Sequence, residues 1–373
     1  MDPYPFLMES APGPEVLLNG RKVLYFAGTS YFQLHAHPEI MAAASKATLE
    51  YGIGTATTRS MTGTTPLIRD LENRIARYFG AEEAAYLPSG YLSNLAGIHA
   101  LTGMGLVDKI FLDKGSHYSN MDGARGSGLP VKPFASRNIE DLKRKLDREL
   151  GRTQRPLIVS DGLFPVQAKL APVEAYLELA EKHDGLVWID DAHGTGMLGK
   201  HGRGTCEYLG VSSSRLFMGS TLSKAFGAYG GMIPGSKMFI SQIRNGSIMR
   251  GSSAPMNAAV AAAHKGLELV EKNPEMRERL HANARYLKEG LKSIKLSTEN
   301  NDLPIAAFSA GDADAMKGLQ KALMEDRIFI QYTTYHGSGA EGVLRIVVFS
   351  THTREQIDLL IATLDKHLPR PTR

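Results

Sequence analysis

Two aspartates and a histidine lie at the end of a short apolar run, residues 186–190, which reads LVWID. Such a run is typical of a strand buried on both faces. Asp190 ends this run, and Asp191 and His193 follow it. Carboxylates and an imidazole at the carboxyl end of a buried strand lie where open α/β sheets bind their ligands. The alternative is that the two aspartates only cap a turn, and this segment alone does not decide between a site and a turn.

A lysine lies among hydroxyl groups and glycines in residues 219–227, which read GSTLSKAFG after another apolar run. In a desolvated pocket, Lys224 could act as an amine nucleophile that forms a Schiff base, with nearby hydroxyls binding a phosphate. An ordinary loop lysine remains the alternative for this segment alone. Residues 88–94, PSGYLSN, join a predicted strand to a predicted helix, whose free N–H groups and positive dipole end form an anion site.

These three segments together provide what a pyridoxal phosphate site needs. The helix start would bind the phosphate, the lysine would form the Schiff base, and a carboxylate would keep the pyridine nitrogen protonated. The competing motifs fail. The run GTGMLGKH does not open a helix directly after a strand, as a dinucleotide fingerprint must, and His201 stands where a phosphate loop needs a hydroxyl. The chain contains no H-E-x-x-H, C-x-x-C or G-x-S-x-G motif, so we expect neither a metal site nor a serine hydrolase.

Six short apolar runs separated by amphipathic segments predict a mostly parallel sheet covered by helices. The runs are residues 84–88, 109–113, 156–162, 186–190, 215–221 and 230–234. Asn138 is a predicted N-cap for a helix that stops before Gly151, and a second helix follows Ala171 and stops before Gly185. We interpret both helices as crossovers between parallel strands.

The pattern changes after Pro255. Two long helical periods are followed by short strands near residues 304–309 and 343–349 and by a last helix, TREQIDLLIATLDKH. These elements predict a smaller α+β domain built from the C-terminal third and the N-terminal segment. The predicted boundaries are 1–45 for the N-terminal segment that packs on the small domain, 46–250 for the large cofactor-binding domain, and 251–373 for the small C-terminal domain.

The composition fits a globular protein. Of 373 residues, 38 are glycine and 43% are hydrophobic, without a collagen repeat. The formal net charge is only +4, so we expect no nucleic-acid partner. No apolar run is long enough to span a membrane, no export signal is visible, and Cys206 is the only cysteine. We therefore expect no membrane partner, no internal disulfide and a cytoplasmic location.

The sequence resembles the α-oxoamine synthases from about Gly20 to Leu368. This family has the aspartate-aminotransferase-like fold of pyridoxal phosphate enzymes and includes 8-amino-7-oxononanoate synthase, 2-amino-3-ketobutyrate CoA ligase and serine palmitoyltransferase. The matching segments are YGIGTATTRSMTGTTPLIRDLE, SGYLSN, KGSHYS, WIDDAHGTGMLGKHGRG, STLSKAFG and LRIVVFSTHT. The resemblance implies an α/β fold in which a large domain contains a mostly parallel seven-stranded sheet flanked by helices.

The resemblance also implies four catalytic residues. Lys224 would hold the cofactor as a Schiff base and later move the α-proton of the substrate. Asp190 would pair with the pyridine nitrogen, and His193 would hydrogen-bond the ring hydroxyl. His117 would stack on the ring face, although without the resemblance a structural histidine would be the better interpretation.

The remaining implied residues bind the phosphate, the substrate and a second subunit. Thr221 would bind the phosphate together with Ser89, Gly90 and Tyr91, the last two through their backbone. Arg345 would hold the amino-acid carboxylate by a bidentate pair, which suits a planar guanidinium. Ser252 or Ser253 lies where the family reaches into the phosphate site of the neighbouring subunit. A homodimer with shared active sites is therefore expected.

The implied reaction condenses an amino acid with an acyl thioester such as an acyl-CoA, with loss of carbon dioxide, to give an α-aminoketone. The chain departs from the family at residues 29–32, at 164–169, where FPVQAK replaces the usual FSMDGD, and at 331–336, QYTTYH. Because these departures lie near the acyl-donor side and in loops, two alternatives stay open. One is an aminotransferase or aldol-cleaving enzyme on the same fold, and the other is a non-catalytic cofactor-binding protein.

Overall fold

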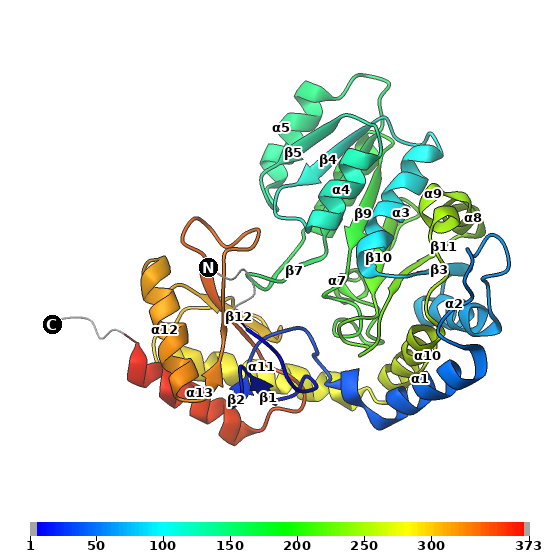
Figure 1. The fold of residues 1–373 in the computed structure, drawn as a ribbon. Helices are drawn as coiled ribbons and strands as arrows, with labels where there is room; N and C mark the ends of the chain where they lie inside the picture. Colours follow the sequence, from blue (N-terminus) through cyan, green and yellow to red (C-terminus); the bar gives the residue numbers. More distant parts are fainter. Residues whose placement is uncertain (1–5, 369–373) are drawn as a thin grey trace. The chain divides into compact units, whose positions relative to one another are not determined.

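A seven-stranded sheet forms the centre of the larger of two compact units in the computed structural model, which describes residues 6–368 (Figure 1). Its strand order is β3-β11-β10-β9-β6-β4-β5. The strands are β3 (Glu83–Leu87), β4 (Lys109–Asp113), β5 (Val131–Phe134), β6 (Pro156–Asp161), β9 (Leu186–Asp190), β10 (Leu216–Thr221) and β11 (Gly231–Gly235). Only β11 runs antiparallel to its neighbours, so the predicted mostly parallel sheet is confirmed.

Each of the six predicted runs forms one of these strands. The seventh strand, β5, gave no such signal because it is short, half-exposed and contains Pro133. It lies at the edge of the sheet, where a proline without an N–H group is tolerated.

Helices cover both faces of this sheet. The helices of the larger unit are α1 (Pro38–Tyr51), α2 (Pro66–Phe79), α3 (Gly90–Gly103), α4 (Tyr118–Gly126), α5 (Ile139–Glu149), α6 (Val173–Lys182), α7 (Thr205–Leu209), α8 (Lys237–Asn245), α9 (Ser247–Gly251) and α10 (Asn257–Lys272). Trp188 packs on one face with residues of α3 and α8, and the neighbouring Val187 packs on the other face with residues of α5 and α6. This double burial explains why the strands are continuously apolar.

The two predicted crossover helices are confirmed as α5 and α6. The side chain of Asn138 accepts a hydrogen bond from the backbone N–H of Asp141 at 2.8 Å, which is the N-cap that the sequence predicts. Helix α6 ends at Lys182, shortly before Gly185.

The smaller unit contains residues 6–36, 165–169 and 274–368. Its helices are α11 (Glu275–Ser293), α12 (Ala313–Glu325) and α13 (Arg354–His367), with a short 3₁₀ helix at Leu34–Ala36. One antiparallel sheet has the order β12 (Ile305–Phe308), β15 (Val343–Val347) and β14 (Gln331–Thr333). A second sheet joins β1 (Glu15–Leu18), β2 (Arg21–Tyr25) and β13 (Ile328–Phe329). A short ribbon of β7 (Leu163–Phe164) and β8 (Lys169–Leu170) lies where the chain passes between the units.

The units divide the chain differently from the boundaries expected at residues 45 and 250. Residues 37–45 and 251–273 lie in the larger unit because α10 packs against α1 and α2. The change of pattern after Pro255 therefore marks the start of α10 rather than a change of unit. The outer ends of the predicted ranges, residues 1–5 and 369–373, lie outside the described residues.

None of the helices within residues 6–368 has the length and apolar character needed to cross a membrane. In the same part of the chain, His, Cys, Asp and Glu side chains form no group of three or more that could hold a metal ion.

Candidate active site

A cavity of about 240 Å³ lies in the larger unit beside the last residues of β6, β9 and β10. It brings together eight of the residues predicted from the sequence. These are Ser89, Gly90, Tyr91, His117, Asp190, His193, Thr221 and Lys224. Segments far apart in the chain therefore meet at one edge of the sheet, as open α/β folds require of a ligand site.

Lys224 and His193 contact each other in this cavity. The Nζ atom of Lys224 lies 2.8 Å from Nε2 of the imidazole. Both side chains are half-buried, so the amine is screened from bulk water without being closed off. An amine and an imidazole at hydrogen-bond distance can pass a proton between them.

Asp190 is buried and held by donors on both carboxylate oxygens. The side-chain amide of Asn94 donates to Oδ2 at 2.5 Å, and the backbone N–H of Ala192 donates to Oδ1 at 3.0 Å. The indole N–H of Trp188 donates to Oδ1 of Asn94 at 3.1 Å, which fixes the orientation of the amide. The carboxyl group of Asp190 thus lines the cavity with both oxygens held by hydrogen-bond donors.

The adjacent Asp191 does not line the cavity. Its carboxylate accepts hydrogen bonds from the backbone N–H of Thr205 at 2.8 Å and from the Thr205 hydroxyl at 2.5 Å. Burial raises the pKa of Asp191 to about 7, and the hydrogen bonds from Thr205 oppose this shift. Asp191 therefore has the turn-capping role and stabilises the glycine-rich loop after β9, whereas Asp190 lines the cavity.

His117 precedes α4 and is held on two sides. Its backbone N–H donates to Oδ1 of Asp161 at 3.0 Å, and its Nδ1 accepts a hydrogen bond from the backbone N–H of Ser119 at 3.1 Å. These contacts fix both the backbone and the ring of His117 at the cavity wall.

The start of α3 forms another wall of the cavity. The Ser89 hydroxyl caps this helix by accepting a hydrogen bond from the backbone N–H of Leu92 at 3.3 Å. A Cβ atom on Gly90 would lie 2.6 Å from Cβ and 2.7 Å from Oγ1 of Thr221. Only glycine lets the helix start approach Thr221 this closely, which leaves a cradle of N–H groups and a hydroxyl that suits a phosphate.

Two predicted site residues of the larger unit are not brought to this cavity. Ser252 and Ser253 do not line it. The Ser252 hydroxyl donates to the carbonyl of Ile248 at 2.5 Å, and Ser253 pairs with Thr58 in an isolated bridge.

Arg345 belongs to the smaller unit, where it lies buried on β15. Its Nε donates to the carbonyl of Pro165 at 2.9 Å. Burial lowers the pKa of Arg345, while interaction with Tyr31 opposes this change. Burial raises the pKa of Tyr31 to about 12 despite the nearby positive charge of Arg345.

Several residues of the cavity wall were not predicted from the sequence. They are Asn94, Ser119, Asp161, Ser223 and Tyr229. Asn94 lies within the matched segment SGYLSN, and Asp161 ends β6 just as Asp190 ends β9. That shared position was the signal that could have identified Asp161.

Comparison with known proteins identifies the family. Residues 23–364 match the model of the family described as aminotransferase class I and II. The 8-amino-7-oxononanoate synthase of Thermosipho melanesiensis is 33% identical, covering 96% of this chain and 92% of that protein. The 8-amino-7-oxononanoate synthase 1 of Bacillus subtilis is 32% identical over 96% of this chain and 91% of its own length.

A solved structure of serine palmitoyltransferase with pyridoxal phosphate superposes on this fold with a TM-score of 0.92. Its sequence is 27% identical, and the match covers 98% of this chain and 93% of that one. These matches confirm the resemblance and the α/β fold that it implied. The chain belongs to the aminotransferase class I and II family and, within it, to the α-oxoamine synthases.

Proposed function

We propose that this protein is a pyridoxal phosphate-dependent acyltransferase that condenses an amino acid with an acyl thioester and releases carbon dioxide to form an α-aminoketone. One observation carries the proposal: Lys224, His193 and Asp190 meet the start of α3 in one cavity. Relatives named 8-amino-7-oxononanoate synthase, at 32–33% identity over nearly the full chain, support the same reaction type.

The residues of the cavity fit pyridoxal phosphate. The cradle between Gly90 and Thr221, which a Cβ atom would fill, suits the phosphate. Asp190 would hold the pyridine N–H, and the amine of Lys224 would attach the aldehyde. When bound, pyridoxal phosphate supplies an electron sink for negative charge that develops at the α-carbon of an amino acid.

Lys224 and His193 would handle the proton of the reaction. The Nζ atom of Lys224 would take the α-proton of the amino acid. Because Nε2 of His193 lies 2.8 Å from Nζ, the imidazole can accept a proton from the amine or return one to it. His117 would orient the bound group, since its backbone and ring are both held by hydrogen bonds.

Arg345 is the proposed ligand of the substrate carboxylate. Its Nε contacts the backbone carbonyl of Pro165 rather than a side chain. The replacement of the family's serine by Pro165 therefore leaves an acceptor for Arg345 in place. The side-chain amide of Gln167 donates to the carbonyl of Gly337 at 2.5 Å, so the first departing segment contacts the residue directly after the second one. We propose that these segments determine which acyl donor is accepted.

A homodimer is proposed from exposed apolar side chains in the larger unit. Leu49, Ile53, Met61 and Met256 are 86%, 64%, 76% and 53% exposed. Backbone hydrogen bonds from Ala254 to Thr57 and from Asn257 to Ile53 join the segment of Ile53 to the segment of Ser252 and Ser253. The resemblance places these serines at the subunit contact, and exposed apolar side chains suit an interaction surface. Sedimentation should give twice the chain mass of 40.6 kDa, and a monomer at working concentrations would refute the dimer. We propose a cytoplasmic enzyme whose partners are an amino acid and an acyl-CoA, without nucleic acid or membrane.

The test is release of free thiol from a panel of acyl-CoAs of increasing chain length, each with glycine, alanine or serine. Thiol and carbon dioxide should appear in equal amounts with at least one pair. In the same assay, Arg345→Ala should raise the KM for the amino acid far more than the KM for the acyl-CoA. Formation of a keto acid without thiol would instead support an aminotransferase. Cofactor binding without any turnover across the panel would support a non-catalytic protein.

A further inference from the structure

Two carboxyl groups share one wall of the cavity. Asp161 and Asp190 are paired residues in the register of the parallel strands β6 and β9, and each is the last residue of its strand. They are 5% and 6% exposed. Neighbouring strands lie about 4.8 Å apart, so two ionised carboxylates here would repel each other strongly in a site with little water.

Their hydrogen-bond donors are distributed differently. Asp190 receives one donor on each oxygen, from Asn94 and from Ala192. Asp161 receives both of its donors on Oδ1, from the backbone N–H of His117 and the side-chain amide of Asn120, each at 3.0 Å. Among residues 6–368 no group donates to Oδ2 of Asp161. The donors around Asp190 therefore suit an ionised carboxylate. The donors around Asp161 suit a protonated carboxylic acid in which Oδ1 is the carbonyl oxygen and Oδ2 carries the proton.

The surrounding charges favour the same assignment. Burial raises the pKa of Asp161 well above its ordinary value, and the negative charge of Asp190 raises it further. Asp113 on β4 acts in the same direction, and the donors His117 and Asn120 act against it. No lysine, arginine or histidine within residues 6–368 forms an ion pair with Asp161. Lys224 and His193 line the same cavity and contact each other.

We propose that Asp161 keeps its proton while Asp190 is ionised, and that the hydroxyl at Oδ2 of Asp161 donates a hydrogen bond to an oxygen of the group bound in the cavity. The pair would thus present an acceptor and a donor side by side. Together they recognise a ring that carries a protonated nitrogen and an oxygen acceptor. The identity of that ring rests on the proposed function, whereas the protonation of Asp161 does not.

The protonation is tested on the protein without cofactor. Infrared spectra at neutral pH should contain a carbonyl band of a protonated carboxylic acid that disappears in Asp161→Asn. Asp113→Asn is the matched control, because it removes a buried carboxyl on the next strand while leaving the band of Asp161 in place. Identical wild-type and Asp161→Asn spectra in this band would overturn the proposal.

The donor role is tested by binding of pyridoxal phosphate, followed by visible absorption. Asp161→Asn replaces the O–H donor with an uncharged N–H donor and should bind within about threefold of the wild type, whereas Asp161→Ala should bind at least about tenfold more weakly. Should the alanine variant fail to fold, Asp161→Ser, which keeps a hydroxyl, serves as the second variant and should bind between the two. Equal weakening in the asparagine and alanine variants would overturn the donor role.

The pH dependence gives a further readout. The donor exists only below the pKa of Asp161, so wild-type cofactor affinity should fall as the pH rises through that raised value. Asp161→Asn should lack this fall, while any pH dependence due to Asp191 or Lys224 remains in both proteins. An equal loss of cofactor affinity with rising pH in the wild type and in Asp161→Asn would refute the proposal. If the infrared band is present but the wild type binds no pyridoxal phosphate, the proposed function fails and the protonation of Asp161 stands.

Discussion

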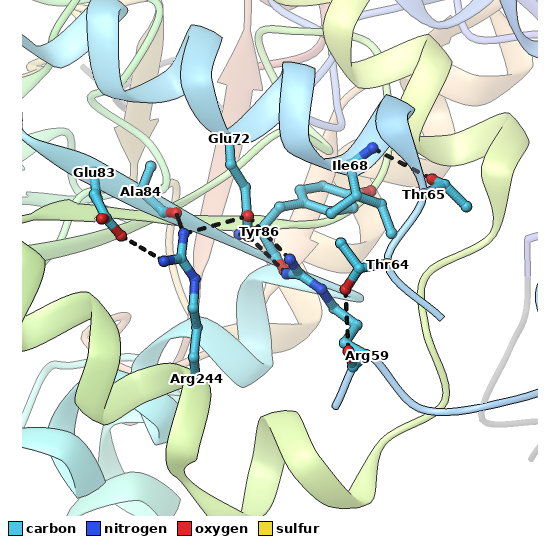
Figure 2. A network of polar contacts seen from close by, with 9 residues as sticks. All are labelled: Arg59, Thr64, Thr65, Ile68, Glu72, Glu83, Ala84, Tyr86 and Arg244. Atoms are coloured by element: carbon cyan, nitrogen blue, oxygen red, sulfur yellow. Dashed lines mark hydrogen bonds and ion pairs between the residues drawn. The ribbon is translucent and has the colours of Figure 1, made fainter. Parts of the chain in front are cut away.

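Two polar clusters of the larger unit show different uses of buried charge. The first ties α2 to β3 and α8 and is shown in Figure 2. Arg59 donates to both oxygens of Glu72, at 2.7 and 2.9 Å, and both side chains are nearly buried. Arg244 lies 3.5 Å from the same carboxylate and also pairs with Glu83.

Backbone groups complete this first cluster. The backbone N–H of Tyr86 donates to Glu72 at 2.9 Å, and the carbonyls of Tyr86 and Ala84 each accept a hydrogen bond from an arginine at 3.1 Å (Figure 2). Every carboxylate of the cluster faces an arginine. Such a network of paired charges holds the three elements together.

The cavity cluster is arranged in the opposite way. Asp190, Asp161 and Lys224 line open volume, and the two aspartates accept hydrogen bonds from neutral N–H groups. The two clusters meet at one point, because the Tyr86 hydroxyl donates to the carbonyl of Tyr229, which lines the cavity. Burial of charged groups therefore does not by itself identify an active site. In this protein the candidate site is distinguished by carboxyl groups that accept hydrogen bonds from neutral donors and line a cavity.

Removing Lys224 should have the largest effect and should act only on the cavity. Lys224→Ala should lower the rate of thiol release by at least about a thousandfold and abolish the visible absorption of bound cofactor, because the attaching amine is gone. The free energy of unfolding should change little, since Lys224 takes no part in the first cluster. The control is Lys237→Ala, an exposed lysine of α8, which should leave both readouts unchanged. Retention of the absorption band in Lys224→Ala would contradict the assignment.

Breaking the first cluster should give the opposite result. Glu72→Ala leaves Arg59 buried without its partner and should lower the free energy of unfolding by about 3–5 kcal/mol, measured by denaturant titration. The protein that remains folded should keep its cofactor spectrum.

The matched control for this change is Glu83→Ala at the exposed end of the same network, where we expect a loss of less than about 1 kcal/mol. Similar losses in the two variants would show that the buried pair does not dominate the network.

The smallest expected effect concerns the approach of α3 to Thr221. Gly90→Ala places a Cβ atom 2.6 Å from Cβ of Thr221, so one of the two must move. We expect a loss of about 1–3 kcal/mol in stability, together with weaker binding of inorganic phosphate and of pyridoxal phosphate. Gly103→Ala at the other end of the same helix is the control, because its Cβ atom meets nothing within 4 Å. If both variants bind phosphate like the wild type, the cradle is not the phosphate site.

The sequence predicted the parts of the fold that depend on local pattern. Continuous apolar runs identified six strands of the sheet, and Asn138 identified the start of α5. It missed β5, a strand of four residues around Pro133 that are mostly partly exposed and therefore lack a continuous apolar pattern. It also predicted a unit boundary near residue 250, whereas α10 belongs to the larger unit. The packing of α10 on α1 joins segments that lie far apart in the chain, so no local sequence pattern indicates it.

For the site, residue type and motif were enough to select Lys224, Asp190 and His193, which carry chemistry that few other side chains can supply. Asn94 and Asp161 were not selected, because an amide within a helix and an aspartate at a strand end are ordinary residues until their neighbours are known. The proposed roles of Ser252, Ser253 and Arg345 stay predictions.

The family, the sheet and the reactive side chains follow from the sequence alone, because apolar periodicity and residues with distinctive chemistry identify them. The contacts that separate the two adjacent aspartates become visible only in the tertiary structure. Along a strand end, neighbouring side chains point to different sides, so Asp191 is closed in by Thr205 while Asp190 lies beside Asp161. The protonation proposed for Asp161 likewise depends on a carboxylate that lies 29 residues away in the chain and on the next strand in space.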